Sequence, residues 1–127
     1  PRRVGWLDLV QIRQSVRTSG LTDIAMTKLD ILGGYKKIKI CTAYRIGKKI
    51  VREMPASLTE LRRAKPIYKI VPGWPTVSEK EKQRLLKSGY AALPSSMKEY
   101  IEFVEKEAGW RVSIISLGPK REETILR

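Results

Sequence analysis

The chain has 127 residues and carries 26 Lys and Arg against 13 Asp and Glu, which gives a formal net charge of +13. We expect one domain with a folded core, because 42% of the residues are hydrophobic and the chain is too short for two cores. The sequence contains no histidine and a single cysteine, which excludes histidine metal sites, serine-histidine triads and internal disulfide bonds.

The first part of the chain predicts one helix and then strands. Apolar residues recur at helical spacing over 6–16, and Gly20 follows as the stop signal for this helix. Residues 21–27 are partly β-branched, which predicts a buried strand leading into a loop. Residues 37–46 alternate between two faces as a strand does, and 47–48 is the two-residue turn of a hairpin.

The rest of the chain predicts helices that alternate with strands. Three helices are expected to begin at serines with a Glu three residues on, a capping-box spacing: Ser57, Ser78 and Ser96. The third carries an apolar stripe over 100–108 and stops at Gly109. Strands are expected at 66–71, 111–117 and 124–126. The alternation predicts an α/β fold, a mixed sheet with flanking helices.

Several prominent side chains are expected to have structural roles. Arg13 and Arg17 are interpreted as the solvated face of the first helix. Trp74 and Trp110 are able to stack on a base, but we interpret them as core residues. Cys41 is interpreted as a small buried hydrophobic residue.

The excess of positive charge predicts an anionic partner without identifying it. One hypothesis is a small basic module that binds nucleic acid, with Lys and Arg on the phosphates and Tyr44, Tyr68 or Trp74 stacked on bases. The other is a mononucleotide site. No apolar run is long enough to cross a bilayer, so we expect a cytoplasmic chain with no membrane partner.

The first loop with a recognisable pattern is Thr27-Lys28-Leu29-Asp30, at the end of an expected strand. Open α/β sheets bind their ligands at the carboxyl ends of strands. The Asp30 carboxylate can accept hydrogen bonds from N1–H and the exocyclic amino group of guanine, a pair of donors that adenine lacks. Lys28 can lay its methylene stem over the base plane. The same four residues also fit a solvated strand end with a local Lys-Asp pair.

The second loop is Ser116-Leu117-Gly118-Pro119, which also follows an expected strand. Gly118 allows a close approach to the backbone, and free N–H groups in this loop can face an acceptor such as guanine O6. Taken alone, the segment also fits an ordinary turn. Together, the two loops would hold one base from two sides.

Longer stretches of the chain resemble the C-terminal part of the adenylosuccinate synthetase family. The stretches that match in order and spacing are RRVGWLD at 2–8, TKLD at 27–30, PGW at 72–74 and SIISLGP at 113–119, with YIE at 100–102 and ETI at 123–125. The chain also opens at Pro1 without a Met. We therefore expect a single C-terminal segment, residues 1–127, of a larger P-loop-like GTP-dependent ligase fold.

The resemblance implies an enzyme of purine biosynthesis that ligates IMP and L-aspartate, with GTP and magnesium, through a 6-phosphoryl-IMP intermediate. It implies that Lys28, Leu29 and Asp30 bind the guanine of GTP and that Ser116, Leu117 and Gly118 complete the base site. It implies further that Arg2 contacts GTP and lies in the aspartate-binding loop. A homodimer and a cytoplasmic location are expected on the same ground.

The chain departs from the family in what it lacks. The phosphate-binding glycine loop, the catalytic Asp and His, the magnesium ligands and most of the IMP site belong to the family's N-terminal part, so we expect no catalytic or metal residue here and no activity from these 127 residues alone. Lys120 stands where an Asp is frequent, which alters the charge near the base site. Besides the nucleic-acid module, the sequence leaves open a scaffold or dimer-contributing piece whose exposed sheet edges self-associate.

Overall fold

In the computed structural model, which describes residues 3–127, the strands form two sheets that share one core. The first sheet is built on the long strand β3 (Lys37–Ile46). The short β1 (Leu7–Asp8) pairs with it in parallel, while β4 (Lys49–Val51) and β5 (Lys65–Pro72) pair with it antiparallel. The hairpin predicted around 47–48 is therefore confirmed.

The strict alternation expected along β3 is interrupted in its middle. The register with β5 shifts between Cys41 and Ala43, and both of these residues are buried along with Ile40 and Tyr44. A bulge of this kind re-aims the side chains on either side of it. Cys41 consequently packs with Val10 and Tyr44 in a second, smaller core cluster, which confirms its interpretation as a buried residue.

The second sheet consists of β2 (Asp23–Met26), β6 (Arg111–Ser116) and β7 (Thr124–Leu126). β2 runs parallel to β6, and β7 pairs with β6 antiparallel. The mixed α/β expectation is confirmed, with the strands divided between two mixed sheets. The prediction of a buried strand at 21–27 is wrong in part, because only Met26 of β2 is buried and the strand has a neighbour on one side only within residues 3–127.

The first helix, α1 (Leu9–Ser19), begins later than the apolar pattern indicates. Its N-cap is Asp8, whose Oδ1 accepts hydrogen bonds from the Val10 N–H at 2.9 Å and the Gln11 N–H at 3.3 Å. The preceding Leu7 and Asp8 form β1, and the apolar Trp6 lies before that strand, outside the helix. Gly20 ends α1 in a left-handed conformation, as expected.

The remaining helices are α2 (Leu58–Arg63), α3 (Glu79–Ser88) and α4 (Ser95–Ala108), with a 3₁₀ turn at Tyr90–Ala92 before α4. Ser57 and Ser78 cap α2 and α3 through their side chains, which confirms both predicted starts. The start predicted at Ser96 is wrong, because the extended Pro94 precedes α4 and Ser96 lies inside it. An N-cap needs an extended backbone, which proline favours at its fixed φ.

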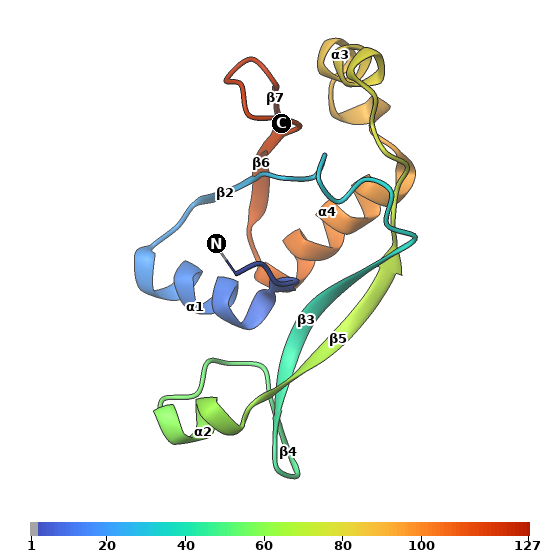
Figure 1. Cartoon of the computed structure of the whole chain (residues 1–127). Coiled ribbons are helices and arrows are strands. Elements are labelled where there is room, and N and C mark those ends of the chain that lie inside the picture. The colour runs from blue at the N-terminus through green and yellow to red at the C-terminus, as the bar shows by residue number, and fades with distance from the viewer. Residues whose placement is uncertain (1–2) are drawn as a thin grey trace.

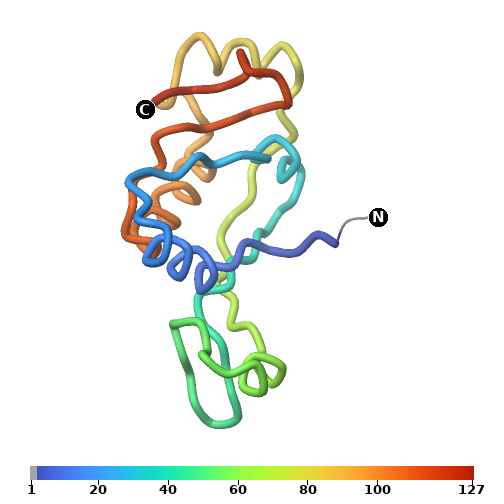
Figure 2. The backbone as a smooth tube through the Cα atoms, turned by 90° about the vertical axis from the view of Figure 1, so that its left-hand side faces the viewer, coloured from blue at the N-terminus to red at the C-terminus, as the bar shows by residue number. Residues whose placement is uncertain are grey.

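α4 lies between the two sheets, as Figure 1 shows, and supplies the centre of the core. Its buried face consists of Met97, Tyr100, Ile101, Val104 and Ala108, which confirms the predicted stripe. From this core the β3–β5 pair extends into an arm that carries β4 and α2 at its tip (Figures 1 and 2). Trp74 is buried in the core, whereas Trp110 is 38% exposed and its core assignment is wrong.

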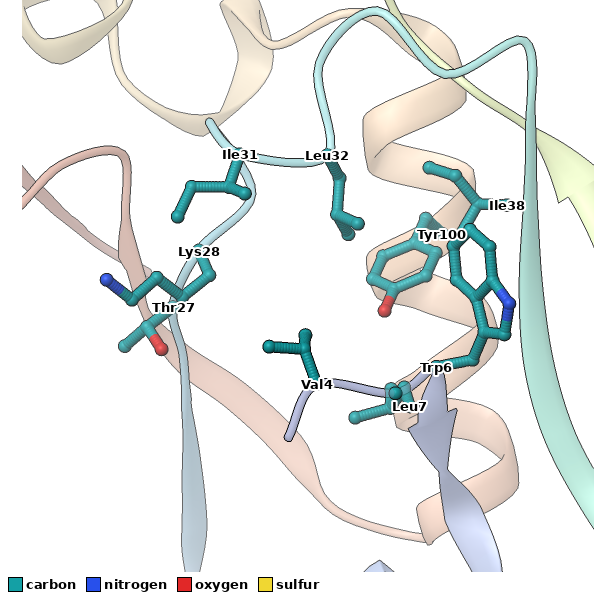
Figure 3. A pocket seen from close by; sticks show the side chains of 10 residues that line it. Val4, Trp6, Leu7, Thr27, Lys28, Ile31, Leu32, Ile38 and Tyr100 are labelled. Atoms are coloured by element: carbon teal, nitrogen blue, oxygen red, sulfur yellow. The ribbon is translucent and has the colours of Figure 1, made fainter. Parts of the chain in front are cut away.

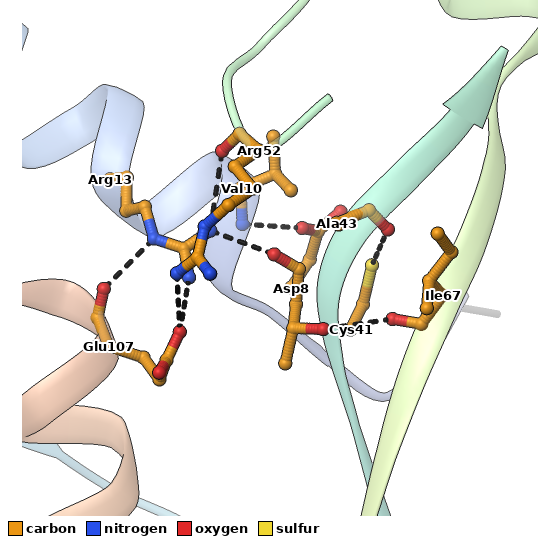
Figure 4. A network of polar contacts seen from close by, with 9 residues as sticks. Asp8, Val10, Arg13, Cys41, Ala43, Arg52, Ile67 and Glu107 are labelled. Carbon is orange, nitrogen blue, oxygen red and sulfur yellow. Dashed lines mark hydrogen bonds and ion pairs between the residues drawn. The ribbon is translucent and has the colours of Figure 1, made fainter. Parts of the chain in front are cut away.

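Arg13 is not part of a solvated face. Its guanidinium donates to the Glu107 carboxylate at 2.8 Å and to the backbone carbonyls of Glu107, Thr42 and Arg52 at 2.9, 2.9 and 3.3 Å (Figure 4). One side chain thus ties α1 to α4 and to the arm. Arg17 on the same helix is exposed and pairs with the exposed Glu53, which fits the expectation.

Candidate functional site

The two loops that the sequence singles out follow neighbouring parallel strands. β2 and β6 run side by side (Figure 2), and at their carboxyl ends Met26 is the partner of Ile115. Residues 27–30 leave the sheet directly after this pair, and Ser116, the last residue of β6, leads into Leu117 and Gly118. The sheet therefore brings both loops to one edge, the edge at which α/β sheets bind ligands.

The first loop has a constrained backbone. Lys28 adopts φ 68, a left-handed conformation that is uncommon for a residue other than glycine and that recurs at functional sites. The neighbouring Leu29 is buried, and its carbonyl accepts a hydrogen bond from Trp74 Nε1 at 2.9 Å. Because the side chain of Leu29 points into the core, Lys28 and Asp30 on either side of it remain accessible to solvent.

Trp74 also holds the segment that follows this loop, since its carbonyl accepts a hydrogen bond from the Gly34 N–H at 2.8 Å. The preceding Gly73 is packed so closely on Tyr35 that a Cβ at position 73 would lie 1.7 Å from the Tyr35 carbonyl oxygen. Only glycine fits there. The Pro-Gly-Trp stretch is thus a clamp on residues 29–36, a role that the sequence analysis missed.

A mainly apolar pocket of about 430 Å³ lies on one side of the first loop (Figure 3). Its lining includes Val4, Trp6, Lys28, Leu32 and Tyr100, and it does not include Asp30 or the second loop. In Figure 3 the Tyr100 hydroxyl points into the pocket, while the Lys28 ammonium points out of it. The pocket therefore borders the first loop at Thr27 and Lys28 without reaching Asp30 or the second loop, and no sequence pattern indicated it.

The second loop is closed by hydrogen bonds within itself. Ser116 Oγ donates to the Gly118 carbonyl at 2.8 Å, and the Leu117 N–H donates to the Glu123 carbonyl at 2.9 Å. The expectation of several free N–H groups is therefore wrong for Leu117. Within residues 3–127 the Gly118 N–H forms no hydrogen bond, which leaves it as the donor of this loop for a ligand.

Glu123 is the buried acid of this region, with 3% of its surface exposed. Its Oε1 pairs with Lys82 Nζ of α3 at 2.6 Å, and its Oε2 accepts from the Lys120 N–H at 2.9 Å. These contacts, with the Lys82 hydrogen bond first, hold the pKa of the Glu123 carboxyl below its usual value. The sequence analysis missed this role, although Glu123 shares the period-2 face of the buried Ile125.

Lys120, noted in the sequence as an unusual charge, is exposed and contributes its backbone N–H to Glu123. Arg2, which the resemblance places at the nucleotide, lies outside the described residues. Among residues 3–127 no group of three or more His, Cys, Asp or Glu side chains is arranged to hold a metal ion. No helix in that range is long and apolar enough to cross a membrane.

Comparison with known proteins identifies one family throughout. A sequence model of adenylosuccinate synthetase matches residues 1–125. The adenylosuccinate synthetase of Caldanaerobacter subterraneus is 48% identical over 126 residues, which are 99% of this chain and 28% of that protein. The protein of the same name from Borrelia turicatae is 46% identical over 127 residues, all of this chain and 28% of its own length.

Among solved structures, the fully ligated adenylosuccinate synthetase of Plasmodium falciparum superposes with a TM-score of 0.85 at 26% sequence identity. The match covers all of this chain and 30% of that one. The chain thus spans less than a third of the length of the relatives it matches.

Proposed function

The chain belongs to the adenylosuccinate synthetase family, and we propose that it forms the guanine-selecting, C-terminal part of a GTP-dependent ligase of purine biosynthesis. The complete enzyme would join IMP and L-aspartate to form adenylosuccinate on the way to AMP. In this proposal the chain contributes the base site for GTP. The N-terminal part of the enzyme supplies the catalytic groups.

The observation that carries the proposal is the parallel pairing of β2 and β6. It brings 27–30 and 116–118, two loops far apart in sequence, to one sheet edge. A purine base presents both donors and acceptors along its edge. A single loop seldom provides hydrogen-bond partners for all of them. Two facing loops with complementary groups support a base site more strongly than either four-residue pattern.

Each loop has a distinct role in this proposal. Asp30 accepts from N1–H and the exocyclic amino group of guanine, and as a charged acceptor it makes strong hydrogen bonds. The Gly118 N–H donates to O6. Adenine presents an amino group at position 6 and an acceptor at N1. The Gly118 N–H would therefore face a donor and the Asp30 carboxylate an acceptor, so both hydrogen bonds would be lost. Lys28, exposed beside Asp30, covers the base with its methylene stem.

Magnesium, when bound in the complete enzyme, neutralises charge on the phosphates during phosphoryl transfer. We assign no residue of this chain to it. Phosphoryl transfer also requires a phosphate clamp and a base in one preorganised site. The cytoplasmic homodimer and the role of Arg2 rest on family membership alone and belong to the same proposal.

The test is an amide NMR titration of the 127-residue chain with GDP, with ADP as the control nucleotide. Saturable shifts at Thr27 to Asp30 and Ser116 to Gly118 with GDP only are the expected result. Equal responses to GDP and ADP would refute base selection by this chain. Binding that tolerates any base and weakens steeply with salt would instead favour the nucleic-acid module.

A further inference from the structure

The carboxylate of Glu123 occupies the space in front of Gly118. A Cβ built on Gly118 would lie 2.2 Å from Glu123 Oε2 and 2.6 Å from its Cδ, far inside van der Waals contact. Gly118 is not among the glycines with positive φ, so its backbone conformation is open to any residue. The need for glycine at this position is therefore set by Glu123 and not by backbone strain.

Glu123 also closes the loop that begins at Ser116. Its carbonyl accepts from the Leu117 N–H at 2.9 Å, its N–H donates to the Lys120 carbonyl at 3.1 Å, and its carboxylate accepts from the Lys120 N–H at 2.9 Å. The backbone and the carboxylate of Glu123 thus hold Leu117 and Lys120 of the 117–123 turn in place. The path of the chain through Gly118 follows from these contacts.

The carboxylate is fixed from outside the loop by α3. Lys82 Nζ lies 2.6 Å from Glu123 Oε1 and 2.8 Å from Glu79 Oε2, and its side chain is largely buried. The two acids raise the pKa of Lys82, which stays protonated throughout the physiological range. Without this ammonium the buried carboxylate would lack its countercharge, a costly arrangement.

We propose that Glu123, held by Lys82, is a positioning residue that shapes the Ser116–Gly118 half-site and orients the Gly118 N–H toward the base. This inference rests on the proposed function for the identity of the ligand. The missing side chain at Gly118 then makes room for the Glu123 carboxylate, while the Gly118 N–H meets the base. The sequence interpretation, in which the glycine admits the ligand itself, predicts a different response to mutation.

A double-mutant cycle separates these two roles of Gly118. The variants are Gly118→Ala, Glu123→Ala and the double mutant, measured by GDP affinity with ADP as control and by hydrogen exchange of the Leu117 and Lys120 amides. We expect Gly118→Ala to weaken GDP binding about tenfold when Glu123 is present, because overpacking of this kind displaces the loop. In the Glu123→Ala background the same substitution should cost less than about twofold.

Equal losses in both backgrounds would overturn the inference and show that the base itself, and not Glu123, requires position 118 to lack a side chain. A second pair of variants keeps the test independent of nucleotide binding. Lys82→Met should speed exchange of the Leu117 and Lys120 amides about tenfold or more, as expected when a local opening becomes easier. Lys80→Met, an exposed neighbour on α3, is the matched control and should leave both rates unchanged.

The outcomes for the two proposals are distinguishable. If the unmodified chain does not bind GDP, the proposed function fails for this chain while the exchange rates still decide the role of Glu123. Exchange that is the same in Lys82→Met and Lys80→Met would refute the positioning role even where GDP binds. Lys82→Arg, which keeps the charge, should restore part of the protection.

Discussion

Removing the guanidinium of Arg13 should destabilise the fold far more than removing that of Arg17, four residues further along α1. The informative substitution is Arg13→Met, which keeps an unbranched stem and deletes the charge. It removes all four hydrogen bonds that Arg13 donates to Glu107, Thr42 and Arg52. Glu107 retains Arg52 at 2.7 Å and so keeps a countercharge.

The magnitude follows from these contacts. A hydrogen bond from a charged donor contributes roughly 1.5 to 3 kcal/mol when buried. The Arg13 and Glu107 side chains are 15% and 19% exposed, and the surviving Arg52 contact reduces the loss, so about 3 kcal/mol for the whole substitution is reasonable. Arg17 and Glu53 are 48% and 74% exposed, so Arg17→Met should cost about 0.5 kcal/mol.

The assay is urea unfolding followed by circular dichroism. With an m-value of roughly 1.5 kcal/mol per M, the midpoint of Arg13→Met should fall by about 2 M and that of Arg17→Met by about 0.3 M. The m-values themselves should agree with that of the unmodified chain. Midpoints that fall equally in the two variants would refute the argument that Arg13 joins α1, α4 and the arm.

Three further predictions concern the site, the core and activity. Asp30→Asn should weaken GDP and admit a xanthine nucleotide, because it exchanges an acceptor for a donor; unchanged GDP affinity in a competition assay would contradict the role of Asp30. Burial raises the pKa of Tyr100 to about 12, so stability is unaffected below pH 10 and falls between pH 10 and 12, where the unfolded chain loses a proton that the folded chain retains. Tyr100→Phe should reduce this loss in urea midpoints measured across that range, and the exposed Tyr35→Phe should not. The purified chain should form no adenylosuccinate from IMP, aspartate and GTP. A chimaera in which the chain replaces the matching segment of the Caldanaerobacter enzyme should form it.

Local signals in the sequence predict most of the elements. The β3–β4 hairpin depends on an alternating pattern and a Gly-containing turn, and both lie within a few residues. The starts of α2 and α3 depend on a serine hydroxyl and the N–H groups beside it. The start of α4 was misplaced because Pro94 offers an equally local extended backbone before two consecutive serines.

The sequence patterns do not predict contacts between residues that are far apart in the chain. Arg13 resembles any surface arginine until α4 and the arm are placed around it, and the division of strands into two sheets depends on the same packing. The two loops were found because strand ends and residue types can be recognised locally. Glu123 was missed because its importance depends on Lys82, which no spacing rule connects to it.

One segment holds both halves of the candidate base site. Trp74 bonds the Leu29 carbonyl of the first loop and the Gly34 N–H just after it. Lys82, eight positions further along, fixes Glu123 behind the second loop. The connection from β5 into α3 therefore sets the relation between the two loops, in addition to the pairing of β2 with β6. A site that must match donors and acceptors on one base benefits from such double support, because errors in the position of either loop cost hydrogen bonds directly. If the proposed base site is correct, the Pro-Gly-Trp stretch and the start of α3 support base recognition from behind the two loops, without touching the edge where the base would lie.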